Sequence, residues 1–482
     1  MPSRAIDLAV IAVYLAGITW FGARFRNSQH SLKDYFLGGR NAPWWAIALS
    51  IVSAETSTLT IIGTPSLSFN GNFGFLQVAF GYLLARIVIS TLFLPAYFRG
   101  EMYTAYQLMD VRFGPRIRKL TAGTFLILRA LAEGVRVFAI SIVISIVLGT
   151  GEMTSILVIL LLTLVYTYEG GMTAVIWTDV VQMILYVVGA GVSLWALLHQ
   201  IDGGWAHVVA TVEPLGKFQV LDFRLGPPGE FFSRTYSFWG GVIGGCFLTT
   251  ASHGTEQLIV QRLLSAGSER QSRAALLSSW VVIFVQFTLF LIVGVCLFTL
   301  YQDRGMVRPA VTDSIYPKFI WEQLPTGISG LVIAAILAAA MSNLSAALNA
   351  LASTTVMDLW RPFVGNRAEI SESVWLGRAR LATVAWGGVL LGVALLARNW
   401  GSVLEAGLGI ASIIYGSLLG VFLLGLLTRK ATETGAMFGM SAGLAITLYV
   451  RIFTPIAWTW YILIGTAVTF AVGYISSPKK QY

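Results

Sequence analysis

Long apolar runs, each about as long as a lipid bilayer is thick, recur along the whole sequence. A helix needs about 20 apolar residues to cross the hydrocarbon layer. The composition agrees, since 56% of the 482 residues are hydrophobic and only 11% are charged, too few to cover a soluble protein of this size. We therefore predict an all-α integral membrane protein that forms a single membrane domain over residues 1–482.

This length criterion predicts about thirteen transmembrane helices. The first run lacks a convincing small-residue cleavage site, so we expect a helix there rather than a signal peptide. The predicted spans are residues 5–23, 42–68, 74–97, 120–148, 153–168, 173–198, 236–260, 275–300, 327–355, 379–397, 402–427, 434–452 and 455–475.

The distribution of positive charge predicts the orientation of these spans. With the N-terminus outside, the cytoplasmic loops hold about twice as many of the 32 Lys and Arg residues as the external loops, as the positive-inside rule requires. We therefore expect the N-terminus outside and the C-terminus in the cytoplasm. The same excess explains the net charge of +9 without a nucleic-acid partner.

Polar residues crowd the second predicted span, 42–68. Its hydroxyl groups could bond back to their own helical turn, and Gly63 could serve close packing. Glu55 favours a functional interpretation, because an unpaired carboxylate at the bilayer midplane is costly. We predict a helix that is broken near the midplane and frees backbone carbonyls for a cation. Its polar positions include Ser50, Ser53, Glu55, Thr56, Ser57, Thr58, Thr60 and Ser66.

Two further spans carry candidate ion ligands. In 327–355, Ala339, Ser342 and Ser345 share one helical face, and their hydroxyl oxygens suit a hard cation such as sodium. Small-residue helix packing explains this pattern equally well. Asp179, at the cytoplasmic start of the sixth span, could hold an ion or could cap its helix.

The fourth predicted span carries a charged face. Arg129, Glu133 and Arg136 lie at i,i+4 and i,i+3 spacings and leave one net positive charge. That charge could pair with Glu55, or it could meet a substrate carboxylate, which a guanidinium binds in a bidentate fork. Arg86, in the third span, is expected to snorkel or to pair locally.

Four motifs in these segments resemble the sodium/solute symporter family, which includes bacterial proline, pantothenate, sialic acid and sugar transporters. They occur in the family's order and spacing. The motifs are residues 34–45 (DYFLGGRNAPWW), 104–106 (TAY) with 112–114 (RFG), 253–257 (HGTEQ) with 260–262 (VQR), and the serine-rich ninth span ending at Met357-Asp358.

The resemblance implies the LeuT-type fold, in which two repeats of five helices enter the membrane in opposite orientations. The repeats would be 42–198 and 236–427, with one extra helix at 5–23 and two at 434–475. It also implies a sodium-coupled symporter in the bacterial cytoplasmic (inner) membrane that functions as a monomer. We find no catalytic set in the sequence that would indicate an enzyme.

The resemblance further assigns a main sodium site between the broken helix and the ninth span. Ser53 and Thr56 would provide backbone carbonyls, Ala339 a third carbonyl, and Ser342 and Asn343 their side chains. The family commonly has a serine at the position of Asn343. Its amide oxygen can still bind sodium, although the side chain is longer.

Some relatives have a second sodium site nearer the cytoplasm. The matching residues here are Asp179, Ser342 and Ser345. Ala346 lacks the last hydroxyl of that site, so we expect one Na⁺ and hold the second site as doubtful.

The substrate positions that the resemblance assigns indicate an anionic or zwitterionic solute, a carboxylate or an amino acid, because an arginine lies among them. A sugar or other neutral solute, proton coupling through Glu55 or Asp179, and a passive carrier stay open as alternatives. The assigned positions are Glu55, Gln77, Arg136, Thr249 and Ser252, with Arg129 and His253 as neighbours.

Overall fold

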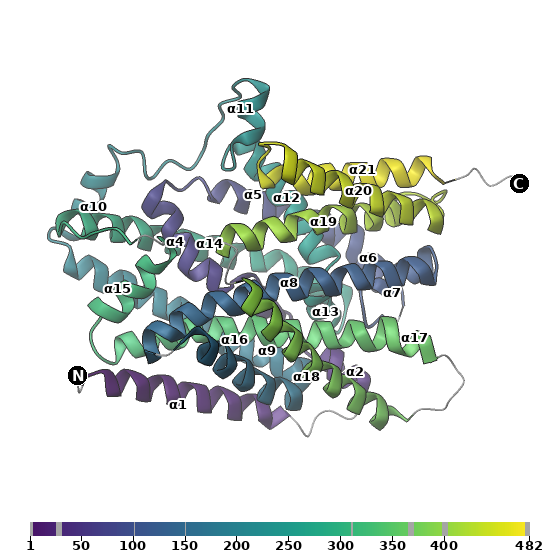
Figure 1. Ribbon diagram of the computed structural model, residues 1–482, viewed down its shortest axis with the longest axis horizontal. Helices are drawn as coiled ribbons and strands as arrows, with labels where there is room; N and C mark the ends of the chain where they lie inside the picture. The colour runs from purple at the N-terminus through teal and green to yellow at the C-terminus, as the bar shows by residue number, and fades with distance from the viewer. Residues whose placement is uncertain are drawn as a thin grey trace, which may run out of the picture.

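Helices make up the architecture of the chain. The computed structural model describes residues 3–25, 31–100, 102–149, 151–309, 312–364, 371–397 and 403–477. Within these ranges the chain forms helices and no β-strand, apart from one isolated bridge between Ala42 and Ala266. Most of the long helices run along one axis and form an elongated bundle (Figure 1). The prediction of an all-α protein is confirmed.

Among the described residues the helices follow one another through short connections, except for a longer excursion around α10 and α11. In chain order they are α1 (Ser3–Ala23), α2 (Leu32–Leu37), η2 (Gly38–Arg40), α3 (Trp44–Glu55), α4 (Thr58–Asn70), α5 (Leu76–Val88), η3 (Ile89–Phe93), α6 (Leu94–Tyr97), α7 (Tyr106–Arg112), α8 (Pro115–Leu148), α9 (Glu152–Gln200), α10 (Gly204–Val212), α11 (Pro228–Ser233), α12 (Phe238–Gly254), α13 (Gln257–Leu264), α14 (Glu269–Asp303), η4 (Thr312–Ser314), α15 (Ile315–Gln323), α16 (Ile328–Thr354), η5 (Thr355–Trp360), α17 (Arg361–Val364), α18 (Glu372–Ala397), α19 (Val403–Leu427), α20 (Glu433–Phe453), η7 (Trp458–Trp460) and α21 (Tyr461–Ile475).

Nine helical stretches among the described residues are long and apolar enough to cross a bilayer, and the bent pair α3–α4 makes a tenth. The two predicted spans 153–168 and 173–198 correspond to the two parts of α9, which are separated by a non-helical backbone conformation at Gly171, where φ is 57° and ψ is −157°. The long helix α8 carries the charged face of Arg129 and Arg136, which lowers its apolar character. The number of thirteen spans stays a prediction.

Two helices are interrupted in the interior of the bundle. The axes of α3 and α4 differ by 64° across the residues between Glu55 and Thr58, so the predicted break is confirmed. The predicted span 236–260 contains a second interruption that was not expected, because α12 ends at Gly254 and α13 begins at Gln257. Each break frees backbone groups that must find partners in the protein, since lipid offers none.

The described ends of the chain lie at opposite ends of the bundle (Figure 1). α1 begins at the end where α10 and α15 lie, whereas α21 finishes at the end where α7 and α17 lie. An odd number of crossings produces this arrangement. The expectation that the N-terminus faces outside is not tested by it and stays a prediction.

Side chains of the sequence motifs contact one another near the end of the bundle where α21 finishes. Gln261 donates from Nε2 to the carbonyl of Phe36 at 2.7 Å, which joins the third motif to the first. The Gln257 side chain accepts from the backbone N–H of Ala105 at 2.8 Å. The Thr104 hydroxyl donates to Asp358 Oδ1, also at 2.8 Å. These hydrogen bonds between motifs explain why the motifs carry polar residues at these positions.

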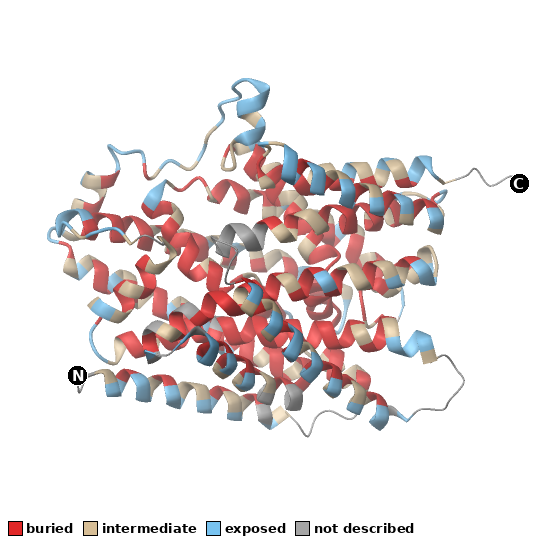
Figure 2. Ribbon diagram, viewed as in Figure 1, coloured by how far each residue is buried: buried red, intermediate tan, exposed pale blue. Residues whose placement is uncertain are grey.

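The outward faces of the helices carry exposed residues (Figure 2), and many of these residues are large and apolar. Val13 on α1 is 72% exposed, and Leu381 on α18 and Phe438 on α20 are 62% and 61% exposed. Such side chains would be costly in water but are suited to lipid contact.

Helices α5 and α12 approach each other more closely than side chains would allow. A Cβ atom on Gly81 would lie 2.3 Å from the carbonyl oxygen of Val242, and one on Gly245 would lie 2.3 Å from that of Val78. Glycine lets backbones meet at this distance, which is typical of packing between membrane helices. The contact holds α12 beside α5, and both helices line the cavity described below.

We predict that Gly245→Ala destabilises the protein by about 1–3 kcal/mol, because the added methyl forces α12 away from α5. The matched control is Gly191→Ala on α9, where no atom lies within 4 Å of the new Cβ. That change should be neutral or stabilising by up to about 1 kcal/mol. Thermal unfolding of purified protein in detergent measures both. Equal effects of the two substitutions would show that the α5–α12 contact is not tight.

Candidate functional site

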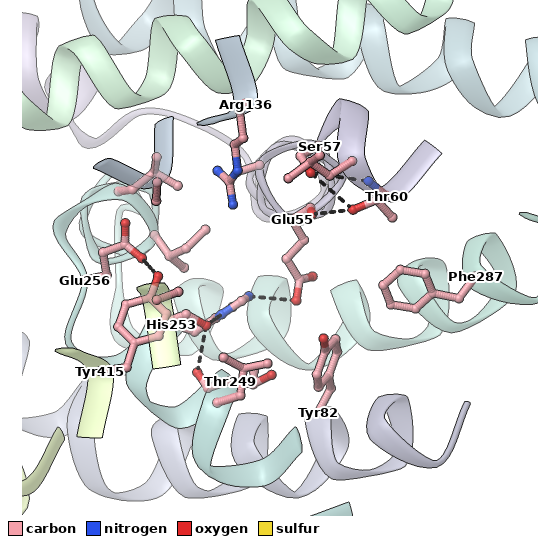
Figure 3. A pocket seen from close by; sticks show the side chains of 18 of the residues that line it. Glu55, Ser57, Thr60, Tyr82, Arg136, Thr249, His253, Glu256, Phe287 and Tyr415 are labelled. Carbon is pink, nitrogen blue, oxygen red and sulfur yellow. Dashed lines mark hydrogen bonds and ion pairs between the residues drawn. The ribbon is translucent and has the colours of Figure 1, made fainter. Parts of the chain in front are cut away.

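A cavity of about 170 Å³ lies beside both helix breaks. Its wall is formed by the α3–α4 break, α5, α8, α12 with α13, α14 and α19. In Figure 3, Arg136, Glu55, His253 and Glu256 point toward the same space, with Tyr82 and Phe287 on one side and Tyr415 on the other. Its polar lining consists of Glu55, Ser57, Thr60, Thr64, Tyr82, Arg129, Arg136, Tyr236, Thr249, Ser252, His253, Glu256 and Tyr415.

Glu55 lies at the end of α3 and is held by two partners. Its Oε2 accepts from Nη2 of Arg86 at 2.5 Å, and its Oε1 lies 3.0 Å from Nε2 of His253. Arg86 is fully buried, and its Nε donates to the Ser279 hydroxyl at 3.0 Å. Of the two partners left open for the arginines of α8, Glu55 is therefore excluded. Of the two expectations for Arg86, snorkelling is wrong, and the side chain is instead paired, with Glu55 and with the carbonyl of Tyr82 one turn earlier. Arg86 supplies the countercharge because a buried carboxylate needs a buried cation.

The arginines of α8 are paired by other carboxylates. Arg129 donates from Nη2 to Glu133 at 2.7 Å and from Nη1 to Glu256 at 3.0 Å. Glu256, at the second helix break, also accepts a hydrogen bond from the hydroxyl of Tyr415. Arg136 has one contact of 3.2 Å with Glu133, and its side chain is 26% exposed. Arg136 is therefore the least tightly held of these charges.

Most of the predicted substrate residues lie together. Glu55, Arg129, Arg136, Thr249, Ser252 and His253 all line the cavity. Gln77 does not, because its amide is bonded to the backbone of Gly74, Tyr236 and Asp222 at 2.9 to 3.1 Å.

Sequence reasoning missed five polar residues of the cavity wall, which are Thr64, Tyr82, Tyr236, Glu256 and Tyr415. Glu256 belongs to the HGTEQ motif and lies within a predicted span. A carboxylate inside a span is a functional signal, so Glu256 could have been identified from the sequence. Tyr415 carries no comparable signal, because tyrosines are common in membrane helices.

The residues of the predicted main sodium site also meet. Asn343 donates from Nδ2 to the backbone carbonyls of Ser53 at 3.2 Å and Thr56 at 2.9 Å. The hydroxyls of Ser53 and Ser342 lie 2.9 Å apart. Ala339 belongs to the same helix, α16, but its side chain lies outside the described residues. Carbonyl and hydroxyl oxygens beside an interrupted helix are suitable donors for a hard cation.

Asp179 lies inside α9 rather than at a helix start, so it does not act as an N-cap. It is fully buried, accepts from the hydroxyls of Ser50 and Ser342, and pairs with Arg262 at 2.7 Å. This pairing neutralises the carboxylate that the doubtful second sodium site would need.

Ser345, the third residue assigned to the second site, has a different partner. Its hydroxyl lies 2.8 Å from the hydroxyl of Thr167 on α9. The structure therefore brings Asp179 to Ser342 but shows no bond between Asp179 and Ser345.

Comparison with known proteins gives consistent matches over nearly the whole chain. The model of the sodium:solute symporter family matches residues 35–443. The human sodium-coupled monocarboxylate transporter 1 is 29% identical over 453 residues, which are 93% of this chain and 73% of that protein. The sodium/sialic acid symporter NanT of Aliivibrio fischeri is 25% identical over 478 residues, covering 98% of this chain and 93% of NanT.

A solved structure has the same fold. It is the substrate-bound outward-open state of a Na⁺-coupled sialic acid symporter, with a TM-score of 0.89 and 26% sequence identity. The superposition covers 99% of each chain.

We predict that Arg86→Met destabilises the protein by about 3–5 kcal/mol, because it leaves the Glu55 carboxylate buried without its main countercharge. The double variant Arg86→Met with Glu55→Gln should recover most of that loss, since no charge is then left uncompensated. Unfolding in detergent, monitored by tryptophan fluorescence, measures the three proteins. A double variant no more stable than the single one would contradict the pairing.

Proposed function

This chain belongs to the sodium:solute symporter family, and from that premise we propose that it couples sodium entry to the import of a small anionic or zwitterionic organic solute by alternating access. The observation that carries this proposal is the position of the α3–α4 break, whose Ser53 and Thr56 carbonyls face Asn343 while the Ser53 hydroxyl faces Ser342. The cavity adjoins the same break, so ion and solute would bind side by side.

The relatives support both halves of the proposal. By their names, the human protein is a sodium-coupled monocarboxylate transporter and the Aliivibrio protein is a sodium/sialic acid symporter. Each of these solutes carries a carboxylate. In the present chain we assign the ion to Ser53, Thr56, Ala339, Ser342 and Asn343.

Arg136 is the group that we assign to the solute's carboxylate. It reaches into the cavity, and its single 3.2 Å contact leaves further N–H donors for a ligand. A bidentate carboxylate would replace this contact while Glu133 keeps its 2.7 Å bond to Arg129. Glu55 and His253, on the opposite wall, would then meet a hydroxyl or ammonium group of the solute.

The proposed cycle starts with the carrier open to the outside. Sodium bound between the broken helix and α16 would stabilise this form, the solute would enter the cavity, and the carrier would then open inward. In this scheme the N-terminus is external, the chain has thirteen spans in two inverted repeats with three extra helices, and the carrier works as a monomer in the cytoplasmic membrane.

A second candidate function is proton-coupled transport, which the contact between His253 and Glu55 favours. His253 also lies 2.9 Å from the Ser252 hydroxyl, and all three side chains line the cavity. Contacts between histidine and carboxylate side chains inside the membrane are typical of proton relays in pumps and transporters. Uptake in sodium-free buffer at several pH values distinguishes the two driving ions.

We predict that Arg136→Gln raises the half-saturating concentration of a carboxylate solute about tenfold or more, because charge-assisted hydrogen bonds are lost. The solute is first chosen by a thermal-shift screen of carboxylates, amino acids and sugars with and without sodium. Uptake into proteoliposomes then measures the effect. The control is Arg224→Gln, which changes a 75% exposed arginine outside the cavity. Unchanged carboxylate uptake by Arg136→Gln would exclude Arg136 as the carboxylate-binding group.

We predict that Ser342→Ala raises the sodium concentration needed for half-maximal uptake, because one hydroxyl ligand is removed. Ser345→Ala is the matched control on the same helix and should leave this concentration unchanged if there is one sodium site. Sodium titrations of uptake and of the unfolding temperature provide two independent readouts. Identical sodium dependence in Ser342→Ala and the unmodified protein would overturn the ligand assignment.

A further inference from the structure

Asn343 makes two hydrogen bonds that bear directly on the ion site. Its Nδ2 donates to the carbonyl oxygens of Ser53 at 3.2 Å and Thr56 at 2.9 Å, and the residue is 1% exposed. Carbonyl oxygens only accept hydrogen bonds, so the end of the amide that faces them must be the NH₂ group. Both carbonyls belong to the interrupted helix, where lipid could not satisfy them.

These carbonyls are the same two that we assign to sodium. One amide nitrogen lies within 3.2 Å of both oxygens and so occupies the position between them that a bridging cation needs. Its N–H groups also direct partial positive charge at the same oxygens, so the amide nitrogen and a cation cannot bridge both carbonyls at once. From this geometry we propose that Asn343 is a tethered competitor of sodium, whose amide nitrogen takes the place of the ion on the Ser53 and Thr56 carbonyls. The inference rests on the proposed function, because it concerns the proposed ion site.

Sodium binding then requires the amide to turn, so that its oxygen faces the ion and its nitrogen faces away. A second, small cavity of about 10 Å³ adjoins the side chain and is lined by Ser57, Glu133, Arg136 and Asn343 among other residues. This volume is about the size that one water molecule needs. The turned NH₂ group would find an acceptor there, in a water molecule or a carboxylate.

The position of this small cavity also relates the ion to the solute. Glu133 and Arg136 form its wall on one side, and Arg136 lines the large cavity as well. A change in which end of the amide faces Arg136 therefore alters the surroundings of the group assigned to the solute. Asn343 is in this respect a positioning residue between the two binding sites.

The competition predicts weak sodium binding. Asn343→Ser keeps an oxygen ligand at the site but replaces the two-donor amide with a shorter side chain, whose single O–H can rotate away from the ion. It should lower the half-saturating sodium concentration about tenfold, the factor that corresponds to two ordinary hydrogen bonds. Asn343→Asp removes the donor and adds a negative charge, so sodium should raise its unfolding temperature more than that of the unmodified protein.

The test is a sodium titration of the unfolding temperature of purified protein, with choline replacing sodium at constant ionic strength. Asn349→Ser is the matched control, because Asn349 is a second buried asparagine of α16, whose Nδ2 contacts the sulfur of Met172 at 3.6 Å. The control should leave the sodium dependence unchanged. The same titration of solute binding at fixed solute concentration shows whether the solute senses the change.

Two results would overturn the inference. One is a half-saturating sodium concentration in Asn343→Ser that equals or exceeds that of the unmodified protein, which would make Asn343 an ordinary ligand. The other is an equal gain in Asn349→Ser. A sodium response in Asn343→Ser with none in the unmodified protein supports the inference. If no variant responds to sodium by unfolding or by uptake, the proposed function fails as well.

Discussion

A backbone carbonyl inside a bilayer must be satisfied by the protein, because lipid offers no hydrogen-bond donor. The interruption between α3 and α4 creates such carbonyls in the interior of the bundle. Their partner comes from α16 and is the amide of Asn343, while the hydroxyl of Ser342 on the same helix meets the Ser53 hydroxyl. The contact between α16 and the interrupted helix follows from this requirement. The location of any cation that replaces the amide follows from it as well.

Buried charged groups likewise need partners within the protein. Each helix break carries a glutamate, Glu55 or Glu256, and each glutamate has an arginine from a neighbouring helix. Asp179 follows the pattern with Arg262. Burying a single charge is far more costly than burying a pair. Each of these buried carboxylates therefore lies where an arginine of a neighbouring helix can reach it. Polar hydroxyls then fill the remaining wall of the cavity.

Much of this arrangement could be predicted from the sequence. Long apolar runs identify membrane helices, and polar residues inside such runs identify the places where a helix is interrupted or carries a binding site. The break after Glu55 was predictable for that reason. The break before Gln257 was not, because its surroundings are rich in glycine and threonine and read as one apolar run. Partner choice was not predictable either. Arg86 lies 31 positions beyond Glu55, and only the tertiary fold, in which α5 packs against α12 and α14, makes it the countercharge rather than Arg129 or Arg136.

The pairing of charges around the cavity has an electrical consequence. Among the described residues in and directly behind its wall, Arg86, Arg129 and Arg136 balance Glu55, Glu133 and Glu256, so with His253 neutral the wall carries no net charge. A carrier of this kind moves little charge of its own when it returns empty, and membrane voltage acts mainly on the cargo. One sodium ion with a monoanion would cross without current, whereas one sodium ion with a zwitterion would carry one positive charge inward. The current would therefore identify the charge of the solute.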